Sequence, residues 1–150
     1  MAAFGLRTAV LAATVVTGCA SGPSQLYEGP ARSRGEIALI AQARGSKARV
    51  FAVDSARTTG DSWILPGPHV VWISFQVVRH GGDLTYTVWT YCQMAFEASA
   101  GGTYLVESFA SQELAKGSSV KTALGARIKD ARGSVVAFPR ACSGDRPKLP

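Results

Sequence analysis

The sequence predicts an all-β fold, a single antiparallel β-sandwich of two sheets and about seven strands. One observation behind this is a series of short runs rich in Val, Ile, Thr and aromatic residues, separated by Gly, Ser, Asp and Pro. A second is that no segment has the apolar spacing of a long helix. The third is a strong hairpin signal between Pro66 and Phe96, where two such runs meet at Gly81-Gly82.

The hairpin assigns side chains to two faces. If Gly81 and Gly82 form the turn, each residue of the first strand has a defined partner on the second. The pairs on one face are then Val71–Cys92, Ile73–Thr90, Phe75–Val88 and Val77–Tyr86, and those on the other are Trp72–Tyr91 and Ser74–Trp89. The second face therefore gathers three aromatic residues, Trp72, Trp89 and Tyr91.

The other expected strands follow from alternation of apolar and polar residues between turn signals. They span residues 36–42, 48–54, 103–109, 120–130 and 134–138, and residues 63–65 lead into the hairpin. Residues 112–116 are expected to form a single helical turn, and residues 130–133 (Asp-Ala-Arg-Gly) a type I turn followed by glycine. The expected β-sandwich domain covers residues 36–142, and residues 143–150 form a flexible tail.

The N-terminal residues do not have the pattern of the folded domain. Arg7 provides a short basic segment, and residues 8–17 form an apolar stretch that is too short to span a bilayer, which takes ~20 residues. The stretch ends in Val16-Thr17-Gly18-Cys19. These features are typical of an export signal at residues 1–18.

This ending resembles the lipobox of bacterial lipoproteins, in which a small residue precedes an invariant cysteine. The resemblance implies that Cys19 becomes the acylated first residue of the mature protein, and that the lipid holds the chain on a membrane. By analogy with sorting rules, Ala20 and Ser21 imply the outer membrane, with the domain facing the periplasm. The alternative is an ordinary cleaved secretory signal in which Cys19 has no role.

Residues 19–35 are rich in Ser, Gly and Pro and are expected to form a flexible tether. Leu26-Tyr27 is its one apolar spot and a candidate for docking onto the body. Without residues 1–18 the chain has 15 basic and 10 acidic residues, a net charge of +5. The charges are scattered, which favours a solvated surface over a lipid-binding patch, and export argues against nucleic acid as a partner.

Two cysteines remain once Cys19 is assigned to the lipid. Cys92 lies in the central hairpin and Cys142 near the C-terminus, in a compartment where disulfides persist. A Cys92–Cys142 bridge would close a loop of about 50 residues and stabilise the fold by roughly 3–4 kcal/mol. The alternative is a buried free thiol at Cys92 and an exposed one at Cys142.

A wider resemblance rests on several motifs. Leu65-Pro66-Gly67-Pro68-His69-Val70-Val71-Trp72-Ile73 is similar to the core of PEGA-like and carboxypeptidase-regulatory-like sandwiches. Small proteobacterial lipoproteins of unknown function share that strand, a lipobox, Ala100-Gly101-Gly102-Thr103-Tyr104 and the Ile128–Gly133 segment. The resemblance covers about residues 25–138. It implies a fold and a location in the cell envelope, and it supplies no catalytic residues. Asp54-Ser55 departs from the Asp-Gly that PEGA-like repeats favour.

A search for catalytic chemistry finds little. His69 and His80 are the only histidines, and a structural or solvent-facing role is the simpler interpretation of both. No Gly-x-Ser-x-Gly motif, metal-ligand spacing or phosphate-binding glycine loop is present, so we expect no metal and no cofactor.

Three functions remain open. The first is a non-enzymatic, lipid-anchored accessory module that meets an envelope protein or a glycan through Trp72, Trp89 and Tyr91. The second is a small secreted hydrolase or inhibitor-type domain that works through a loop. The third is a purely structural role, in which Cys19 anchors the domain and its stable body acts as a spacer. The alternative for the aromatic face is that it packs inward, against another strand, Leu26-Tyr27 or the loop around Glu113.

Overall fold

The computed structural model describes residues 22–81, 83–114 and 120–149. The prediction of an all-β fold is confirmed, because these residues contain eleven strands and no helix. The strands are β1 (Ser24–Gln25), β2 (Ala38–Gln42), β3 (Arg49–Val53), β4 (Ala56–Arg57), β5 (Ser62–Ile64), β6 (Gly67–Gly81), β7 (Leu84–Ala98), β8 (Thr103–Leu114), β9 (Val120–Asp130), β10 (Val135–Ala137) and β11 (Ala141–Ser143).

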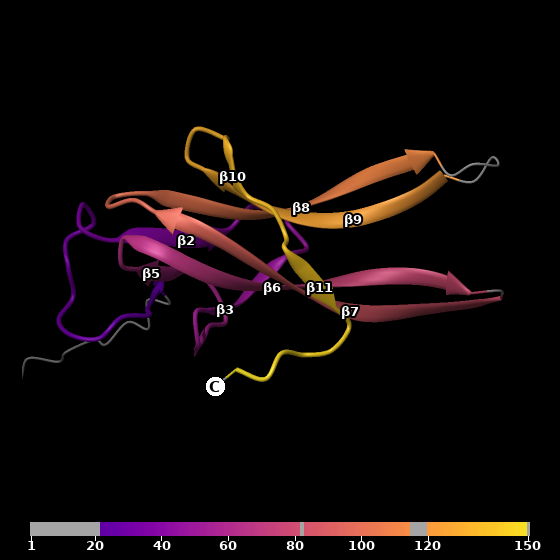
Figure 1. The fold of residues 1–150 in the computed structure, drawn as a ribbon, viewed down its shortest axis with the longest axis horizontal. Helices are drawn as coiled ribbons and strands as arrows, with labels where there is room; N and C mark the ends of the chain where they lie inside the picture. The colour runs from indigo at the N-terminus through magenta and orange to yellow at the C-terminus, as the bar shows by residue number, and fades with distance from the viewer. Residues whose placement is uncertain (1–21, 82, 115–119, 150) are drawn as a thin grey trace, which may run out of the picture.

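The strands form two sheets that stack as layers (Figure 1). One sheet has six strands in the order β1-β5-β2-β8-β9-β10, and the other has five in the order β11-β7-β6-β3-β4. The long hairpins β6–β7 and β8–β9, one from each sheet, extend in the same direction beyond the shorter strands (Figure 1). The two layers match the predicted sandwich in outline.

The prediction of purely antiparallel sheets is wrong for the six-stranded sheet. In that sheet β1 pairs with β5, and β2 with β8, in parallel. Strand direction is not encoded in alternation, because a strand with one buried face alternates in the same way in either direction. The expected count of about seven strands is also too low, because two- and three-residue strands leave no recognisable periodicity.

The central hairpin pairs with a register that differs from the predicted one. Gly81 lies opposite Leu84 and is therefore part of the ladder rather than of the turn, and Gly82 lies outside the described residues. Each assigned partner shifts by two residues, so that Ile73 faces Cys92 instead of Thr90. Gly81-Gly82 and Gly82-Asp83 are both favourable residue pairs for a two-residue turn, so the residue types alone did not decide which pair forms it. A shift of two preserves alternation, and both faces are as predicted.

The core lies between the sheets. From the five-stranded sheet it receives the inward row of the central hairpin, and from the six-stranded sheet the inward residues of β2, β5, β8 and β9. Its largest fully buried side chains are those of Ile40, Ile64, Ile73, Met94, Ile128, Val71 and Val106. Burying one side chain of this size stabilises the folded state by about 1.5–3 kcal/mol, so the inward rows account for the packing of the two sheets against each other.

The disulfide between Cys92 and Cys142 is confirmed, with the two sulfurs 2.02 Å apart. Cys142 belongs to β11, which pairs with β7 so that the two cysteines lie directly opposite each other. Their Cα atoms are 4.1 Å apart. The covalent bond therefore holds the C-terminal segment as the edge strand of the five-stranded sheet, and this strand extends to Ser143, one residue past the predicted end of the domain.

Two other segments depart from prediction. The sheet begins inside the expected tether, because the Ser24 amide donates to Asp61 at 2.9 Å and the Leu26 amide to Trp63 at 3.0 Å. Leu26 packs against the core, as its apolar character indicated. The expected helical turn is wrong over residues 112–114, which continue β8 opposite β9, because cross-strand pairing supplies hydrogen bonds that one helical turn lacks. Residues 115–116 lie outside the described residues.

Candidate functional site

The outer face of the five-stranded sheet carries all three aromatic residues that the sequence singled out. Strand pairing arranges this face in rows that run across the sheet. One row places Gln76 of β6 opposite Trp89 of β7. The next rows are Arg49–Ser74–Tyr91 and Ala52–Trp72–Gln93. Trp72, Trp89 and Tyr91 thus lie on three successive rows of one surface.

A β-bulge adds a fourth aromatic residue to this face. The register of β3 against β6 shifts between Val50 and Ala52, and Phe51 is the extra residue. The Phe51 ring packs edge-on against Tyr91 with 5.6 Å between centroids. Simple alternation placed Phe51 and Val53 on one face of β3 and Val50 and Ala52 on the other. The sequence analysis did not assign Phe51 to this face, because alternation groups it with Val53, which the bulge places in the buried row opposite Val71.

Two arginines cover the Phe51 ring. The guanidinium carbon of Arg146 lies 4.9 Å from the ring centroid, and that of Arg57 lies 5.8 Å away. Arg146 follows β11, so the disulfide-held C-terminal segment returns across the sheet. Cation–π contacts of this kind contribute about 0.5–1 kcal/mol at exposed sites. This half of the face is therefore occupied by the protein's own side chains.

Trp89 differs from the other aromatic residues of the face. Its side chain is 45 % exposed, whereas Trp72 and Tyr91 are half-buried. Tyr91 is thus partly covered, because its ring packs against Phe51 of the same protein. The alternative that the aromatic residues pack against the protein itself holds for Tyr91 to this extent. Trp89 remains open to solvent.

Trp89 forms one side of a groove of about 550 Å³. The remaining lining residues are Ser46, Lys47, Arg49 and Gln76. The sequence analysis missed this set, because the β2–β3 connection that carries Ser46 and Lys47 is brought to Trp89 only by tertiary packing. Two cations, a carboxamide and an indole meet here, and none of the described lining residues is acidic.

The loop on the cationic side of the groove is fixed by Ser46 and Ser108. Ser46 Oγ accepts hydrogen bonds from the amides of Ala48 at 3.1 Å and Ser108 at 2.9 Å. The Lys47 amide donates to Ser108 Oγ at 2.9 Å. These bonds tie the connection between the sheets to β8, so the backbone that presents Lys47 has a defined position.

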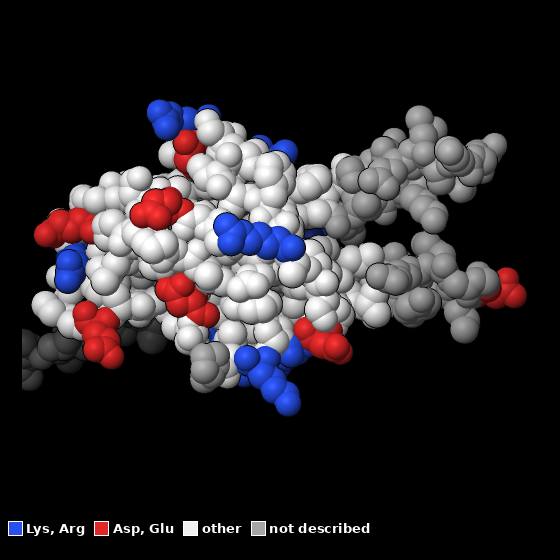
Figure 2. Space-filling model, viewed as in Figure 1, with Lys and Arg blue, Asp and Glu red and all other residues white. Residues whose placement is uncertain are grey.

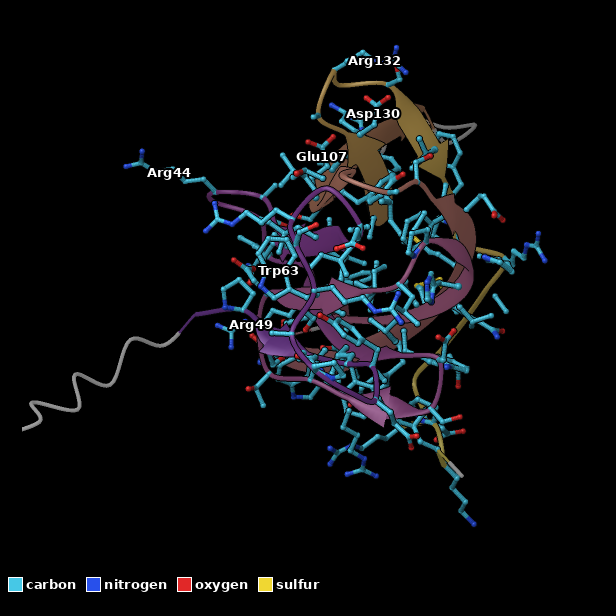
Figure 3. The ribbon with its side chains drawn as sticks, turned by 90° about the vertical axis from the view of Figure 1, so that its left-hand side faces the viewer. Arg44, Arg49, Trp63, Glu107, Asp130 and Arg132 are labelled. Carbon is cyan, nitrogen blue, oxygen red and sulfur yellow. A yellow bond between two sulfur atoms is a disulfide. The ribbon has the colours of Figure 1, made fainter. Side chains whose placement is uncertain are left out.

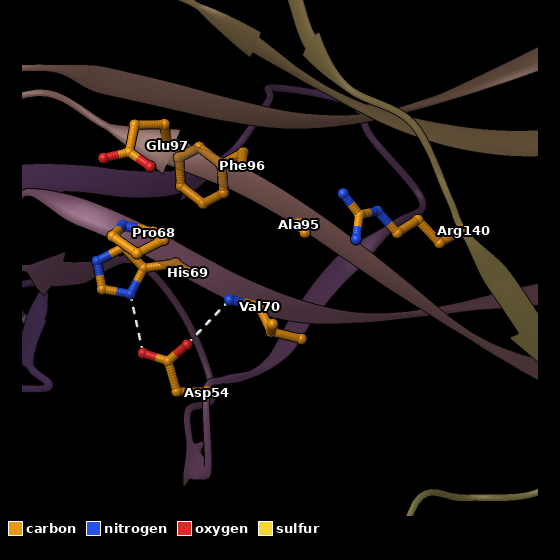
Figure 4. A pocket seen from close by; sticks show the side chains of 8 residues that line it. All are labelled: Asp54, Pro68, His69, Val70, Ala95, Phe96, Glu97 and Arg140. Atoms are coloured by element: carbon orange, nitrogen blue, oxygen red, sulfur yellow. Dashed lines mark hydrogen bonds and ion pairs between the residues drawn. The ribbon is translucent and has the colours of Figure 1, made fainter.

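A second cavity, of about 360 Å³, lies at the start of β6 and contains His69 (Figure 4). His69 Nδ1 lies 2.8 Å from Asp54 Oδ2, and Nε2 lies 2.7 Å from the Leu65 carbonyl oxygen. A carbonyl oxygen only accepts, so Nε2 carries a proton and donates it. With Nδ1 facing a carboxylate, His69 has no ring nitrogen available as a base.

The other residues around this cavity do not complete a catalytic set. In the described part of the chain they are Pro68, Val70, Ala95, Phe96, Glu97 and Arg140, and none of these has a hydroxyl or a thiol. Arg140 lies across β6 and β7 from Asp54 (Figure 4). The His69–Asp54 pair therefore forms a structural clamp. The side chain of His80, the second candidate base, lies outside the described residues.

Two carboxylates on the six-stranded sheet have pKa values below the usual range. A hydrogen bond from Lys129, with a further one from Arg127, lowers the pKa of Glu107. A hydrogen bond from the backbone amide of Ser134 lowers the pKa of Asp130. This bond closes the predicted turn at residues 130–133, in which Gly133 has a positive φ. The carboxylate of Asp130 stabilises a turn, and that of Glu107 forms cross-strand ion pairs with Arg127 and Lys129. Both carboxylates therefore have structural roles.

The charges of the described residues are interspersed. Figure 2 shows acidic and basic side chains alternating over one face of the molecule without a continuous region of one sign. Among the residues described, no three His, Cys, Asp or Glu side chains gather as a metal ion would require. The same residues include no helix long and apolar enough to cross a bilayer. Cys19 lies outside the described residues.

The fold and this surface define a two-sheet, β-sandwich-like domain with one disulfide and an aromatic and cationic outer face. No family model, curated protein or solved structure matches the chain.

Proposed function

We propose that this protein is a lipid-anchored module of the cell envelope that binds a partner and catalyses no reaction. The observation that carries the proposal is the exposed indole of Trp89 beside Lys47 and Arg49. Aromatic and arginine side chains are enriched at contact surfaces, because they bury a large area and keep a polar group for hydrogen bonding. The expected partner is an envelope protein or a glycan.

The proposed location in the cell envelope rests on the N-terminal sequence and on the disulfide. Val16-Thr17-Gly18-Cys19 resembles a lipobox, and the Cys92–Cys142 bridge fits an oxidising compartment. Acylation of Cys19 would hold the domain on a membrane, and Ala20 and Ser21 favour the outer membrane, with the domain facing the periplasm. The resemblance to small proteobacterial lipoproteins with a PEGA-like sandwich is part of the same proposal.

The geometry of His69 weighs against the small hydrolase considered from the sequence. A general base needs a free ring nitrogen within reach of a hydroxyl or a water. Both nitrogens of His69 face acceptors of the protein itself. A purely structural spacer would leave the open indole of Trp89 without a role, which favours the binding module.

The proposed anchor is tested by the intact mass of the protein from the membrane fraction of its native host. We expect wild type to carry the added mass of acyl chains and a Cys19→Ala variant to lack it. Cleavage after residue 18 without acylation would contradict the anchor and indicate a soluble secreted domain. An uncleaved N-terminus would contradict export.

A further inference from the structure

We propose that the groove between Trp89 and the Lys47–Arg49 segment binds an anionic saccharide, a sugar that carries carboxylate or phosphate groups. This inference rests on the proposed binding function and names the class of ligand. The volume of the groove, about 550 Å³, lies in the range of small-ligand sites, ~300–1,000 Å³. We call it the Trp89 groove.

The charge of the groove selects an anion. Lys47 and Arg49 are both exposed on its β3 side. Within the described part of the chain, no carboxylate lies at ion-pair distance from either of them, since the ion pairs found there join other residues. Their positive charge is thus available to a ligand. Arg49 also points outward from the body in Figure 3.

The indole and the carboxamide favour a sugar over a simple ion. The face of an indole carries negative charge density, and the C–H groups of a pyranose ring that stack on it are weakly positive. Gln76 lies directly across the strand pair from Trp89, and its carboxamide both donates and accepts hydrogen bonds. A hydroxyl-rich ring seated on Trp89 would find Gln76 beside it and the cations across the groove.

The groove is largely preformed. Trp89 and Gln76 stand on paired strands of the longest ladder in the molecule. On the other side, Ser108 holds the Ser46–Lys47 backbone through hydrogen bonds. A rigid site avoids part of the entropy cost of ordering loops on binding, which matters most for a small polar ligand.

A bilayer surface fits this groove less well. Proteins that insert into the interface present several apolar side chains together. Among the described residues that line the groove, Trp89 is the single apolar side chain, and its neighbours Ser46 and Gln76 are polar. The surface thus supplies one stacking platform and two cations, as a charged sugar requires.

The test measures binding by isothermal titration calorimetry, with the full chain purified in detergent. The probes are an oligogalacturonate, a neutral malto-oligosaccharide of similar length, polyglutamate, and glycerophosphoglycerol, the soluble headgroup of phosphatidylglycerol. We expect the oligogalacturonate to bind at least about tenfold more tightly than each of the others, and more weakly as salt is raised.

Variants locate the site. Trp89→Ala, and the double variant Lys47→Ala with Arg49→Ala, should each weaken oligogalacturonate binding by about tenfold or more. The matched control is Arg44→Ala with Arg132→Ala, which removes two exposed arginines and changes the net charge equally. Figure 3 shows Arg44 projecting away from the body and Arg132 at a distant turn. The control should bind as wild type does. All these side chains are exposed, and unchanged circular dichroism would verify folding.

Several results would overturn the proposal. Equal binding of polyglutamate would mean that charge alone is recognised, and preferential binding of glycerophosphoglycerol would make the groove a contact for lipid headgroups. Equal losses in the groove and control variants would move the site elsewhere. Cys19→Ala should bind oligogalacturonate as wild type does. A failure of acylation therefore leaves this result intact, and a failure of binding leaves the anchor intact.

Discussion

His69 and Asp54 join two segments that meet at one end of the five-stranded sheet. Asp54 is the non-glycine residue of the described chain with a positive φ, 52°, at the turn between β3 and β4. Its Oδ2 lies 2.8 Å from His69 Nδ1, and its Oδ1 accepts the Val70 amide at 2.9 Å. One carboxylate thus fixes the β3–β4 turn to the start of β6.

Replacing Asp54 tests this clamp. Asp54→Ala removes both hydrogen bonds and places alanine in the left-handed region, so we expect a loss of about 1–3 kcal/mol in the free energy of unfolding. Asp54→Asn should cost less, because asparagine tolerates this φ and still accepts the Val70 amide. Urea unfolding measures both, with the exposed Asp145→Asn as control. Equal losses for Ala and Asn would show that the carboxylate charge, rather than the shape, matters.

The Cys92–Cys142 bridge closes a loop of 50 residues. On the chain-entropy model, Cys142→Ser should lower the free energy of unfolding by about 4 kcal/mol, because the unfolded chain gains freedom. The measurement is the urea midpoint with and without dithiothreitol. Reductant should lower the wild-type midpoint to that of the variant and leave the variant unchanged. A wild-type midpoint that is the same in reductant would contradict the prediction.

Gly125 on β9 lies directly opposite Phe109 on β8, and the Phe109 ring covers it. A Cβ at position 125 would lie 2.6 Å from the ring, which also holds the Arg127 guanidinium 5.1 Å from its centroid. Gly125→Ala should therefore displace the ring and destabilise the fold by about 1–3 kcal/mol.

The control for this substitution is Gly60→Ala, where a Cβ meets nothing within 4 Å and φ is ordinary. This variant should be neutral or slightly more stable than wild type, because alanine restricts the unfolded chain. Chemical denaturation compares the two variants. Similar stability of both would mean that the Phe109 ring moves aside at no cost.

Glu107 should make the fold sensitive to acid. Hydrogen bonds from Lys129 and Arg127 lower its pKa in the folded state below the usual 4.5. Its contribution is therefore complete above pH 4.5 and is lost as the pH falls through the folded-state pKa. Glu107→Gln should be less stable than wild type near neutral pH, and this difference should shrink in acid.

Unfolding of wild type and Glu107→Gln at a series of pH values checks the sign of this effect. The ion pair with Lys129, at 2.7 Å, is partly exposed, so raising salt should also reduce the difference. A difference that grows as the pH falls would contradict the assignment.

Much of the central hairpin could be predicted from local sequence. Alternation placed Val71, Ile73 and Phe75 on the buried face and Trp72, Trp89 and Tyr91 on the other. The exact partners could not be predicted, because neighbouring turn pairs at Gly81–Asp83 are of similar quality. A two-residue difference changes every cross-strand contact and leaves the faces intact.

The candidate site divides in the same way. Trp89 could be identified as an aromatic residue on the outer face, but not as the exposed one. Tyr91 is partly covered by its edge-on contact with Phe51, whereas Trp89 is exposed. Lys47 and Arg49 of the Trp89 groove are more than 35 residues from Trp89 in the chain, and hydrogen bonds to Ser108 position the loop that carries Lys47.

The sequence by itself determined the all-β class and the two faces of the central hairpin, because alternation is a local property of each strand. It favoured the pairing of Cys92 with Cys142, because three cysteines allow few pairings. Tertiary structure alone decided the parallel pairing of β2 with β8, the β11 edge strand and the Trp89 groove. These depend on which distant segments bury surface together, and the free energy of that burial belongs to the assembled layers rather than to any one segment.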